Sequence, residues 1–147
     1  RAGDFDCMLL AGRYTLLEQN PLDSFLPLAE ERNIAILLGG VFNSGVLATG
    51  PVAGAKYNYA DAPPDILDRA GRIEAVCRRH GVPLPVAAMR FPLGHPAIAS
   101  IVLGAVSPQE AARNFDGFFQ RVPADLWRDL KAEGLMRRDA PAPPEAL

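Results

Sequence analysis

Residues 101–115, IVLGAVSPQEAARNF, join an apolar run to a helix signal through a single glycine. The run that ends at Gly104 is apolar and β-branched without alternation, which is typical of a strand covered on both faces. Ser107, Pro108 and Glu110 follow at the spacing of a helix N-cap, first helical position and capping box. A buried strand that turns into a helix is the repeating unit of parallel α/β proteins.

Two other stretches repeat this pattern. FDCMLLAG (5–12) and IAILLGG (34–40) are short apolar runs that end in glycine. Amphipathic helix patterns lie between and after the three runs, in residues 20–33, 65–81, 83–96, 107–121 and 123–134. In the fourth of these patterns we expect Ala111, Phe115, Phe118 and Phe119 to face inward. The alternation of strands and helices predicts a parallel α/β architecture.

Three strands are too few for a complete doubly wound sheet or an eight-stranded barrel. The chain also begins almost directly on a strand, so we expect residues 1–147 to be a single partial domain of something larger. Residues 41–64 are rich in Gly, Ala and Pro and form a long connection, which favours a functional or mobile loop. Residues 135–147, rich in Pro and Ala, predict a loosely ordered tail.

Composition excludes several functional classes. The 147 residues carry a net charge of −2 and no basic stripe, so nucleic-acid binding is not expected. Apolar runs fall far short of the ~20 residues that span a bilayer, and no secretory leader pattern is present. Cys7 and Cys77 are predicted to be buried thiols, and no Cys/His spacing suggests a metal. We therefore expect a soluble cytoplasmic protein without a metal or membrane partner.

The glycines that end the strands indicate where a ligand binds. In parallel α/β folds ligands lie at the carboxyl ends of strands, where glycine lets them approach the backbone. Gly39 and Gly40, followed by the long loop, favour a ligand, whereas Gly12 is interpreted as a turn residue. For Ser107–Glu110 two interpretations stay open: a capping box alone, or a phosphate at the helix N-terminus.

Candidate catalysts are scarce. Tyr14, Tyr57 and Tyr59 could donate protons, but no lysine or carboxylate stands at an evident spacing to tune them. Neither a nucleophile elbow nor a Walker-type loop is present. The sequence therefore predicts a binding surface without an assembled catalytic set.

Five blocks together resemble the aldo-keto reductases: RYTLLEQ (13–19), ERNIAILLGGVFNSGVLATG (31–50), KYNYADAPP (56–64), AAMRFPLGHPAIASIVLGAVSPQEAARNF (87–115) and WRDLKAEGL (127–135). The resemblance runs nearly end to end but covers only the C-terminal half of that family's (β/α)8 TIM barrel. It implies that the three strands are barrel strands six, seven and eight.

The resemblance implies a bound nicotinamide dinucleotide and a small sugar or aldehyde substrate. It points to the branch that oxidises an aldose at C1, of the L-fucose or D-threo-aldose type, with pyridoxal oxidation as a second option. The family's catalytic Asp, Tyr, Lys and His lie in the N-terminal half, so no residue here is assigned a catalytic role, and the isolated chain is expected to be inactive. Two competing hypotheses are a non-catalytic nucleotide-binding module and an unrelated phosphate-binding barrel. The latter would usually supply a Schiff-base lysine or metal-binding carboxylates.

The resemblance also implies a cofactor site in two parts. The loop after the second strand would follow the nicotinamide ribose and pyrophosphate, and the turn after the third would hold the adenosine end. The residues so implied are Gly39, Gly40, Val41, Phe42, Asn43, Ser44, Leu103, Gly104, Ala105, Val106, Ser107, Glu110, Arg113 and Asn114. Many members stack a tyrosine of a Tyr-Ser-Pro-Leu motif on the nicotinamide. Here Phe42, or a residue outside the chain, would cover the ring. Trp127 is a weaker candidate for a substrate-pocket wall, and core packing is the competing interpretation.

One departure from the family bears on the cofactor. Members that prefer NADPH usually carry a basic residue where Gly104 stands and an arginine where Glu110 stands. Here neither charge is present, and the Glu110 carboxylate would repel a 2′-phosphate by an energy on the order of kcal/mol. A carboxylate accepts hydrogen bonds from unmodified ribose hydroxyls instead. We therefore expect NAD to be preferred over NADP.

Overall fold

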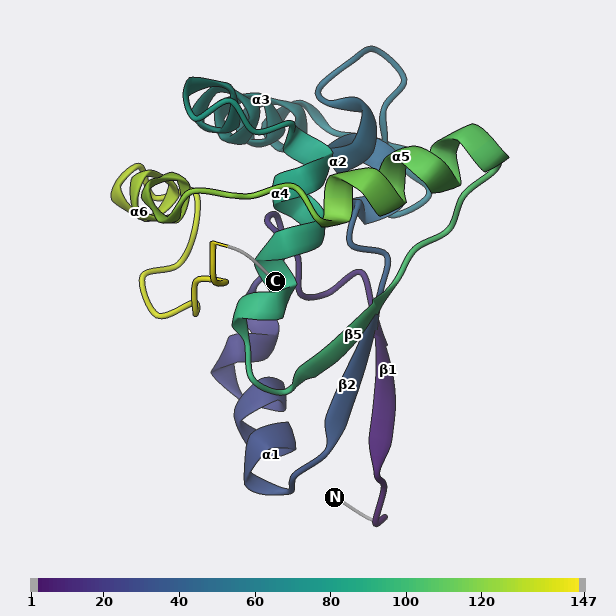
Figure 1. The fold of residues 1–147 in the computed structure, drawn as a ribbon, viewed down its shortest axis with the longest axis vertical. Coiled ribbons are helices and arrows are strands. Elements are labelled where there is room, and N and C mark those ends of the chain that lie inside the picture. Colours follow the sequence, from purple (N-terminus) through teal and green to yellow (C-terminus); the bar gives the residue numbers. More distant parts are fainter. Residues whose placement is uncertain (1–2, 146–147) are drawn as a thin grey trace.

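The computed structural model describes residues 3–145 and contains a three-stranded parallel sheet (Figure 1). Its strands are β1 (Cys7–Ala11), β2 (Ala35–Gly39) and β5 (Ile98–Val102), in the order β1-β2-β5. All pairings are parallel, so the three predicted strands and their direction are confirmed. Within residues 3–145 no helix is long and apolar enough to cross a bilayer.

The connections are mainly helical. Between β1 and β2 lies α1 (Phe25–Glu31), after a 3₁₀ turn at Asn20–Asp23. Between β2 and β5 lie a 3₁₀ turn (Asn43–Gly45), α2 (Val46–Thr49), the hairpin strands β3 (Lys56–Tyr57) and β4 (Ala60–Asp61), α3 (Pro64–Arg79), α4 (Leu84–Arg90) and a 3₁₀ turn (Phe91–Gly94). After β5 come α5 (Pro108–Phe118) and α6 (Ala124–Ala132). The long connection predicted as a loop is therefore partly ordered into a short helix and a hairpin.

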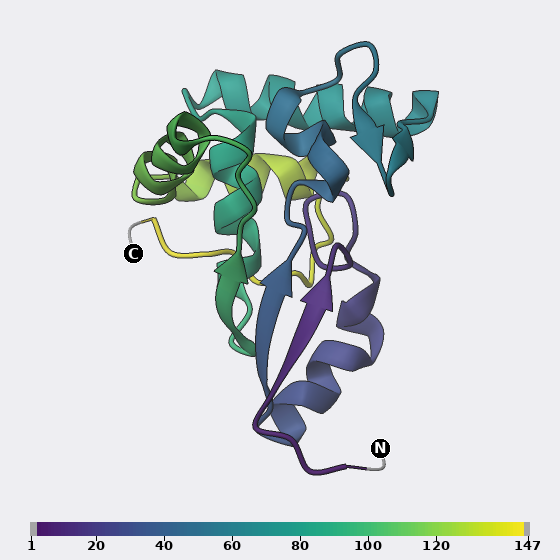
Figure 2. The same cartoon turned by 90° about the vertical axis from the view of Figure 1, so that its right-hand side faces the viewer.

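The sheet is covered on one face only. Helix α1 packs behind the strands, and Figure 2 shows the opposite face of the sheet without a helix over it within residues 3–145. On β1 the side chains alternate between half-buried and exposed positions, and Leu9 is 64% exposed. The prediction that Cys7 is buried is wrong because this residue shares the uncovered face with Leu9. Cys77 is buried as predicted, and burial raises the pKa of its thiol to about 12.

Helix α5 packs on α4 rather than on the sheet. A Cβ added at Gly117 would lie 3.2 Å from carbons of Met89 and Val86, so the missing side chain permits this contact. The expectation that Ala111, Phe115, Phe118 and Phe119 face inward is wrong for three of them. Phe118 is half-buried, whereas Ala111 is exposed and Phe115 and Phe119 are 67% and 61% exposed. They border an apolar groove of about 470 Å³ between β5 and α5. They are exposed because no layer of the described chain covers this side of the helix.

The C-terminal segment is packed on the body of the molecule. Leu135, Met136 and Ala140 are buried, which differs from the loosely ordered tail expected for residues 135–147. A buried arginine holds the end of this segment. The Arg90 guanidinium donates hydrogen bonds to the carbonyls of Gln120 (3.0 Å) and Pro144 (2.9 Å), and a buried charge requires such acceptors. The last two residues of the predicted tail lie outside the described residues.

Trp127 belongs to the core. Its side chain is 1% exposed, and its ring lies 6.4 Å from that of Phe91, which in turn lies 5.0 Å from Tyr14. The assignment of Trp127 to a substrate-pocket wall is therefore not supported, and the competing interpretation of core packing describes its position. The amphipathic pattern of α6 places it there, since Leu126 and Leu130 are buried on the same helix.

We predict that Gly40→Ala destabilises the protein more than Gly134→Ala. Both glycines have a left-handed φ, of 68° and 69°, so alanine is strained by about 1–2 kcal/mol at either position. A Cβ at Gly40 would also lie 3.1 Å from the Gly12 amide nitrogen, whereas one at Gly134 meets nothing within 4 Å. The free energy of unfolding should therefore fall further for Gly40→Ala, by about 1 kcal/mol or more. Equal losses in urea titrations would contradict the close contact.

A second prediction concerns the buried His95. Burial lowers its pKa, against a smaller opposing effect of Glu30, and its Nδ1 accepts a hydrogen bond from the Ala97 amide at 3.2 Å. The unfolded state therefore binds a proton more readily than the folded state. Stability is fully present above the unfolded pKa of about 6.5 and is lost as pH falls through the lower folded pKa. His95→Asn retains an acceptor but does not titrate.

Urea unfolding between about pH 5 and 7 should thus show a steeper loss of stability for the wild type than for His95→Asn. The carboxyl groups with shifted pKa values, such as those of Asp61 and Asp139, are shifted downward by Lys56 and Arg137 and titrate at lower pH. Parallel pH profiles for the two proteins would show that His95 does not carry this dependence.

Candidate functional site

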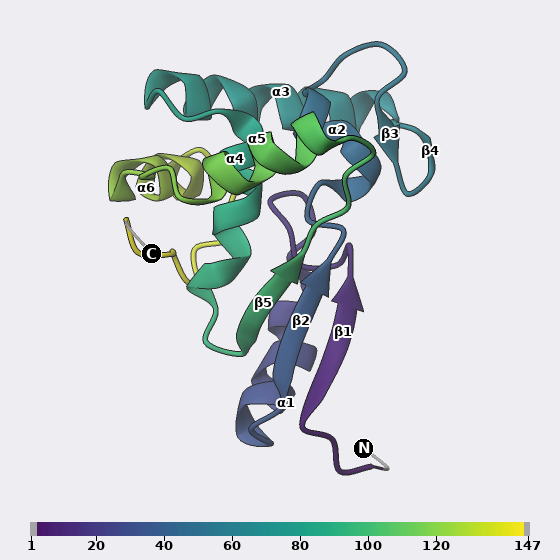
Figure 3. The same ribbon diagram turned by 45° about the vertical axis from the view of Figure 1, so that its right-hand side comes forward.

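The carboxyl ends of β1, β2 and β5 lie at one edge of the sheet, beneath α2 and the β3–β4 hairpin (Figure 3). There the backbones of Gly12 and Gly40 meet. The Gly12 amide donates a hydrogen bond to the Gly39 carbonyl at 2.8 Å, and Gly40 has a φ of 68°. A Cβ at Gly40 would lie 3.1 Å from the Gly12 amide nitrogen, so glycine at this position lets the two loops approach closely. Gly12, interpreted from sequence as a turn residue, therefore also fixes the contact between the loops.

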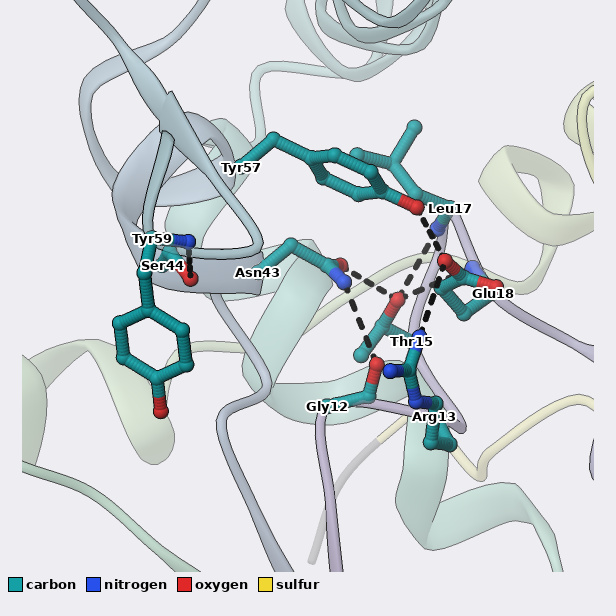
Figure 4. Close-up of polar contacts among 9 residues, drawn as sticks. All are labelled: Gly12, Arg13, Thr15, Leu17, Glu18, Asn43, Ser44, Tyr57 and Tyr59. Atoms are coloured by element: carbon teal, nitrogen blue, oxygen red, sulfur yellow. Dashed lines mark hydrogen bonds and ion pairs between the residues drawn. The ribbon is translucent and has the colours of Figure 1, made fainter. Parts of the chain in front are cut away.

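The loop after β2 has an unusual backbone. Asn43 and Ser44 have left-handed φ values of 48° and 61°, which cost energy for residues other than glycine and persist only where surrounding contacts hold them. Asn43 is 3% exposed, and its Oδ1 accepts a hydrogen bond from Thr15 Oγ1 at 2.5 Å (Figure 4). Its Nδ2 donates to the Gly12 carbonyl at 3.4 Å. Asn43 therefore joins the loops after β1 and β2.

The β3–β4 hairpin is attached to both loops. The Tyr57 hydroxyl donates a hydrogen bond to the Glu18 carboxylate, and the Tyr59 amide donates to Ser44 Oγ at 3.1 Å (Figure 4). Burial, followed by the hydrogen bond and charge of Glu18, raises the pKa of Tyr57 to about 12. Sequence spacing gave no partner for this tyrosine because Glu18 lies 39 positions away in the chain. The high pKa argues against Tyr57 as a proton donor near neutral pH.

A cavity of about 300 Å³ lies between the two loops and the hairpin. Its lining residues are Ala11, Gly12, Arg13, Gly40, Asn43, Ser44, Asn58 and Tyr59. Three residues predicted for the cofactor loop thus face the cavity, whereas Gly39 lies in β2 and Val41 is buried. Phe42, proposed to cover the nicotinamide, packs against the core and does not line this cavity. The exposed aromatic residue of the cavity is Tyr59, for which the sequence suggests only a role as proton donor.

The turn after β5 forms the second part of the predicted site. Ser107 is the N-cap of α5, and its Oγ accepts a hydrogen bond from the Glu110 amide at 3.2 Å. The Glu110 carboxylate accepts one from the Val106 amide at 2.9 Å. The capping interpretation is therefore confirmed, with the carboxylate bound one residue before the N-cap. Gly104 has open space where a side chain would stand.

Asn114 and Arg113 follow on α5. Arg113 is exposed, and Asn114 lines the groove between β5 and α5. The Asn114 Nδ2 atom is buried and has no hydrogen-bond partner among residues 3–145. A buried donor without an acceptor is costly, so the groove fits a group that supplies an acceptor, as an adenine ring nitrogen would. In the same residues no three His, Cys, Asp or Glu side chains converge as metal ligands would.

The two parts share one sheet edge but not one cavity. Gly39 pairs with Val102 in the register of β2 and β5, so their following loops start side by side. The cavity under the hairpin lies on the β1 side of this edge, and the turn into α5 lies on the other. An extended ligand could contact both, since neighbouring strands are about 4.8 Å apart.

Comparison with known proteins gives the family. A model described as the aldo/keto reductase family matches residues 1–132. The chain is 47% identical over 133 residues to a pyridoxal 4-dehydrogenase from Microbacterium luteolum, which covers 90% of this chain and 39% of that protein. It is 41% identical over 131 residues to a D-threo-aldose 1-dehydrogenase from a Pseudomonas species. This match covers 88% of this chain and 40% of that protein. The chain spans about 40% of the length of these curated relatives.

Solved structures agree on the fold. The apo form of an aldo-keto reductase from Bacillus halodurans superimposes with a TM-score of 0.66 at 20% identity, over 92% of this chain and 45% of that one. A glycerol dehydrogenase from Gluconobacter oxydans superimposes with a TM-score of 0.65 at 18% identity, over 97% of this chain and 45% of that one. The three parallel strands are thus part of a (β/α)8 barrel, as predicted. The chain belongs to the aldo/keto reductase family.

Proposed function

We propose that this chain is the C-terminal, dinucleotide-binding part of an NAD-preferring oxidoreductase. The loops after β2 and β5 would hold the cofactor, with Gly40 and Ser44 toward the nicotinamide half and Ser107, Glu110 and Asn114 toward the adenosine half. The bound dinucleotide supplies hydride transfer at C4 of its nicotinamide ring. The family's catalytic Asp, Tyr, Lys and His would come from the rest of the barrel, so the chain alone should not turn over substrate.

The observation that carries the NAD preference is the position of the Glu110 carboxylate. Its hydrogen bond to the Val106 amide fixes it at the N-terminus of α5. Residues 103–110 contain no lysine or arginine, and Arg113 follows Glu110 by three positions on α5. A 2′-phosphate placed there would be repelled, whereas a ribose hydroxyl can donate a hydrogen bond to a carboxylate.

For the substrate we propose an aldose oxidised at C1, of the L-fucose or D-threo-aldose type. This proposal is supported by the resemblance to the D-threo-aldose 1-dehydrogenase. The second candidate is pyridoxal, because the identity to the pyridoxal 4-dehydrogenase is higher, 47% against 41%. Initial rates of the complete protein with L-fucose, other aldoses and pyridoxal, each with saturating NAD, separate the two.

Replacing Glu110 should change the cofactor preference of the complete protein. We expect Glu110→Arg to lower the ratio of kcat/KM for NAD to that for NADP by about tenfold or more, since about 1.4 kcal/mol corresponds to a factor of ten. Glu110→Gln keeps an acceptor for the Val106 amide but removes the charge, so it should shift the ratio in the same direction by less.

Glu31→Arg is the matched control, because it makes the same charge change at an exposed position where α1 ends, before the amino end of β2. Its cofactor ratio should equal that of the wild type. A wild-type protein that uses NADP more efficiently than NAD, or a Glu110→Arg variant with an unchanged ratio, would refute the proposed preference.

A further inference from the structure

The cavity under the hairpin has a positive lining. Arg13 is its one charged residue, and the other lining residues are small or neutral polar ones. The Arg13 side chain is 59% exposed, and its nearest ion-pair partner is Glu18 at 3.9 Å. A surface pair at that distance contributes little, and the Glu18 carboxylate already accepts the Tyr57 hydroxyl. The guanidinium is therefore available to a ligand at small cost.

The neutral lining groups match an oxyanion as well. Ser44 and Tyr59 contribute hydroxyls, Asn58 contributes an amide, and Gly12 and Gly40 leave the backbone open to close approach. The planar guanidinium of arginine binds phosphate oxygens through two parallel hydrogen bonds, which a point charge cannot do. Positive charge, several donors and no carboxylate in the lining together describe an anion site.

We propose that Arg13 binds the diphosphate of the dinucleotide. This inference rests on the proposed function and adds to it the residue that neutralises the cofactor. At the N-terminus of α5 the capping contacts of Ser107 and Glu110 occupy local amides, and residues 103–110 contain no cation. In the cavity under the hairpin the cation is Arg13, from the loop after β1. The ends of β1 and β5 are two strand spacings apart, about 10 Å, which one extended dinucleotide spans.

The test is calorimetric titration of the complete protein with NAD and, separately, with nicotinamide riboside, which lacks the diphosphate. Arg13→Gln should weaken NAD binding by about tenfold or more, in line with the loss of a charge-assisted hydrogen bond. It should leave the affinity for nicotinamide riboside unchanged. Arg13→Lys keeps the charge without the planar fork, so its affinity for NAD should fall between those of Arg13→Gln and the wild type.

Arg32→Gln is the matched control, because Arg32 is an exposed arginine at the C-terminus of α1, before the amino end of β2. It should bind NAD as the wild type does. The inference is overturned if Arg13→Gln binds NAD with wild-type affinity while the wild type binds it normally, a result that leaves the proposed function standing. An equal loss for nicotinamide riboside would also overturn it, since the diphosphate would then not be the group recognised. A wild-type protein that binds no dinucleotide would defeat the proposed function and this inference together.

Discussion

The backbone contact between Gly12 and Gly40 is the constraint on which the candidate site depends. It brings the loop after β1 against the loop after β2, and a Cβ at Gly40 would crowd the Gly12 amide at 3.1 Å. The hydrogen bond from Thr15 to Asn43 then holds the left-handed turn of the second loop. The hairpin closes over both through Tyr57 and Tyr59. The cavity lies where the two loops and the hairpin meet.

Charge is divided between the two halves of this edge. On the β5 side the N-terminus of α5 is satisfied by its own capping residues and carries a carboxylate. On the β1 side Arg13 is held only loosely by Glu18. A dinucleotide with a free 2′-hydroxyl matches this division, because its single diphosphate needs a cation and its ribose hydroxyls need acceptors. A second phosphate on the ribose would meet the Glu110 carboxylate.

The strands, their parallel direction and most helices could be predicted because each depends on local signals: continuous apolar runs, glycine stops and amphipathic spacing. The capping of α5 was predictable for the same reason. What the sequence could not indicate is which surfaces are covered. Cys7 and Phe115 have the pattern of buried residues, yet no layer of the described chain lies over them. The partnership of Tyr57 with Glu18 depends on the path of the hairpin, which no short-range spacing reveals.

The central claim is that the loops after β1, β2 and β5 form one dinucleotide site, and a crystal structure of the complete protein with NAD tests it most directly. The account predicts the diphosphate within hydrogen-bond distance of the Arg13 guanidinium and a hydroxyl of the adenosine ribose on the Glu110 carboxylate. A dinucleotide bound away from both side chains would contradict it.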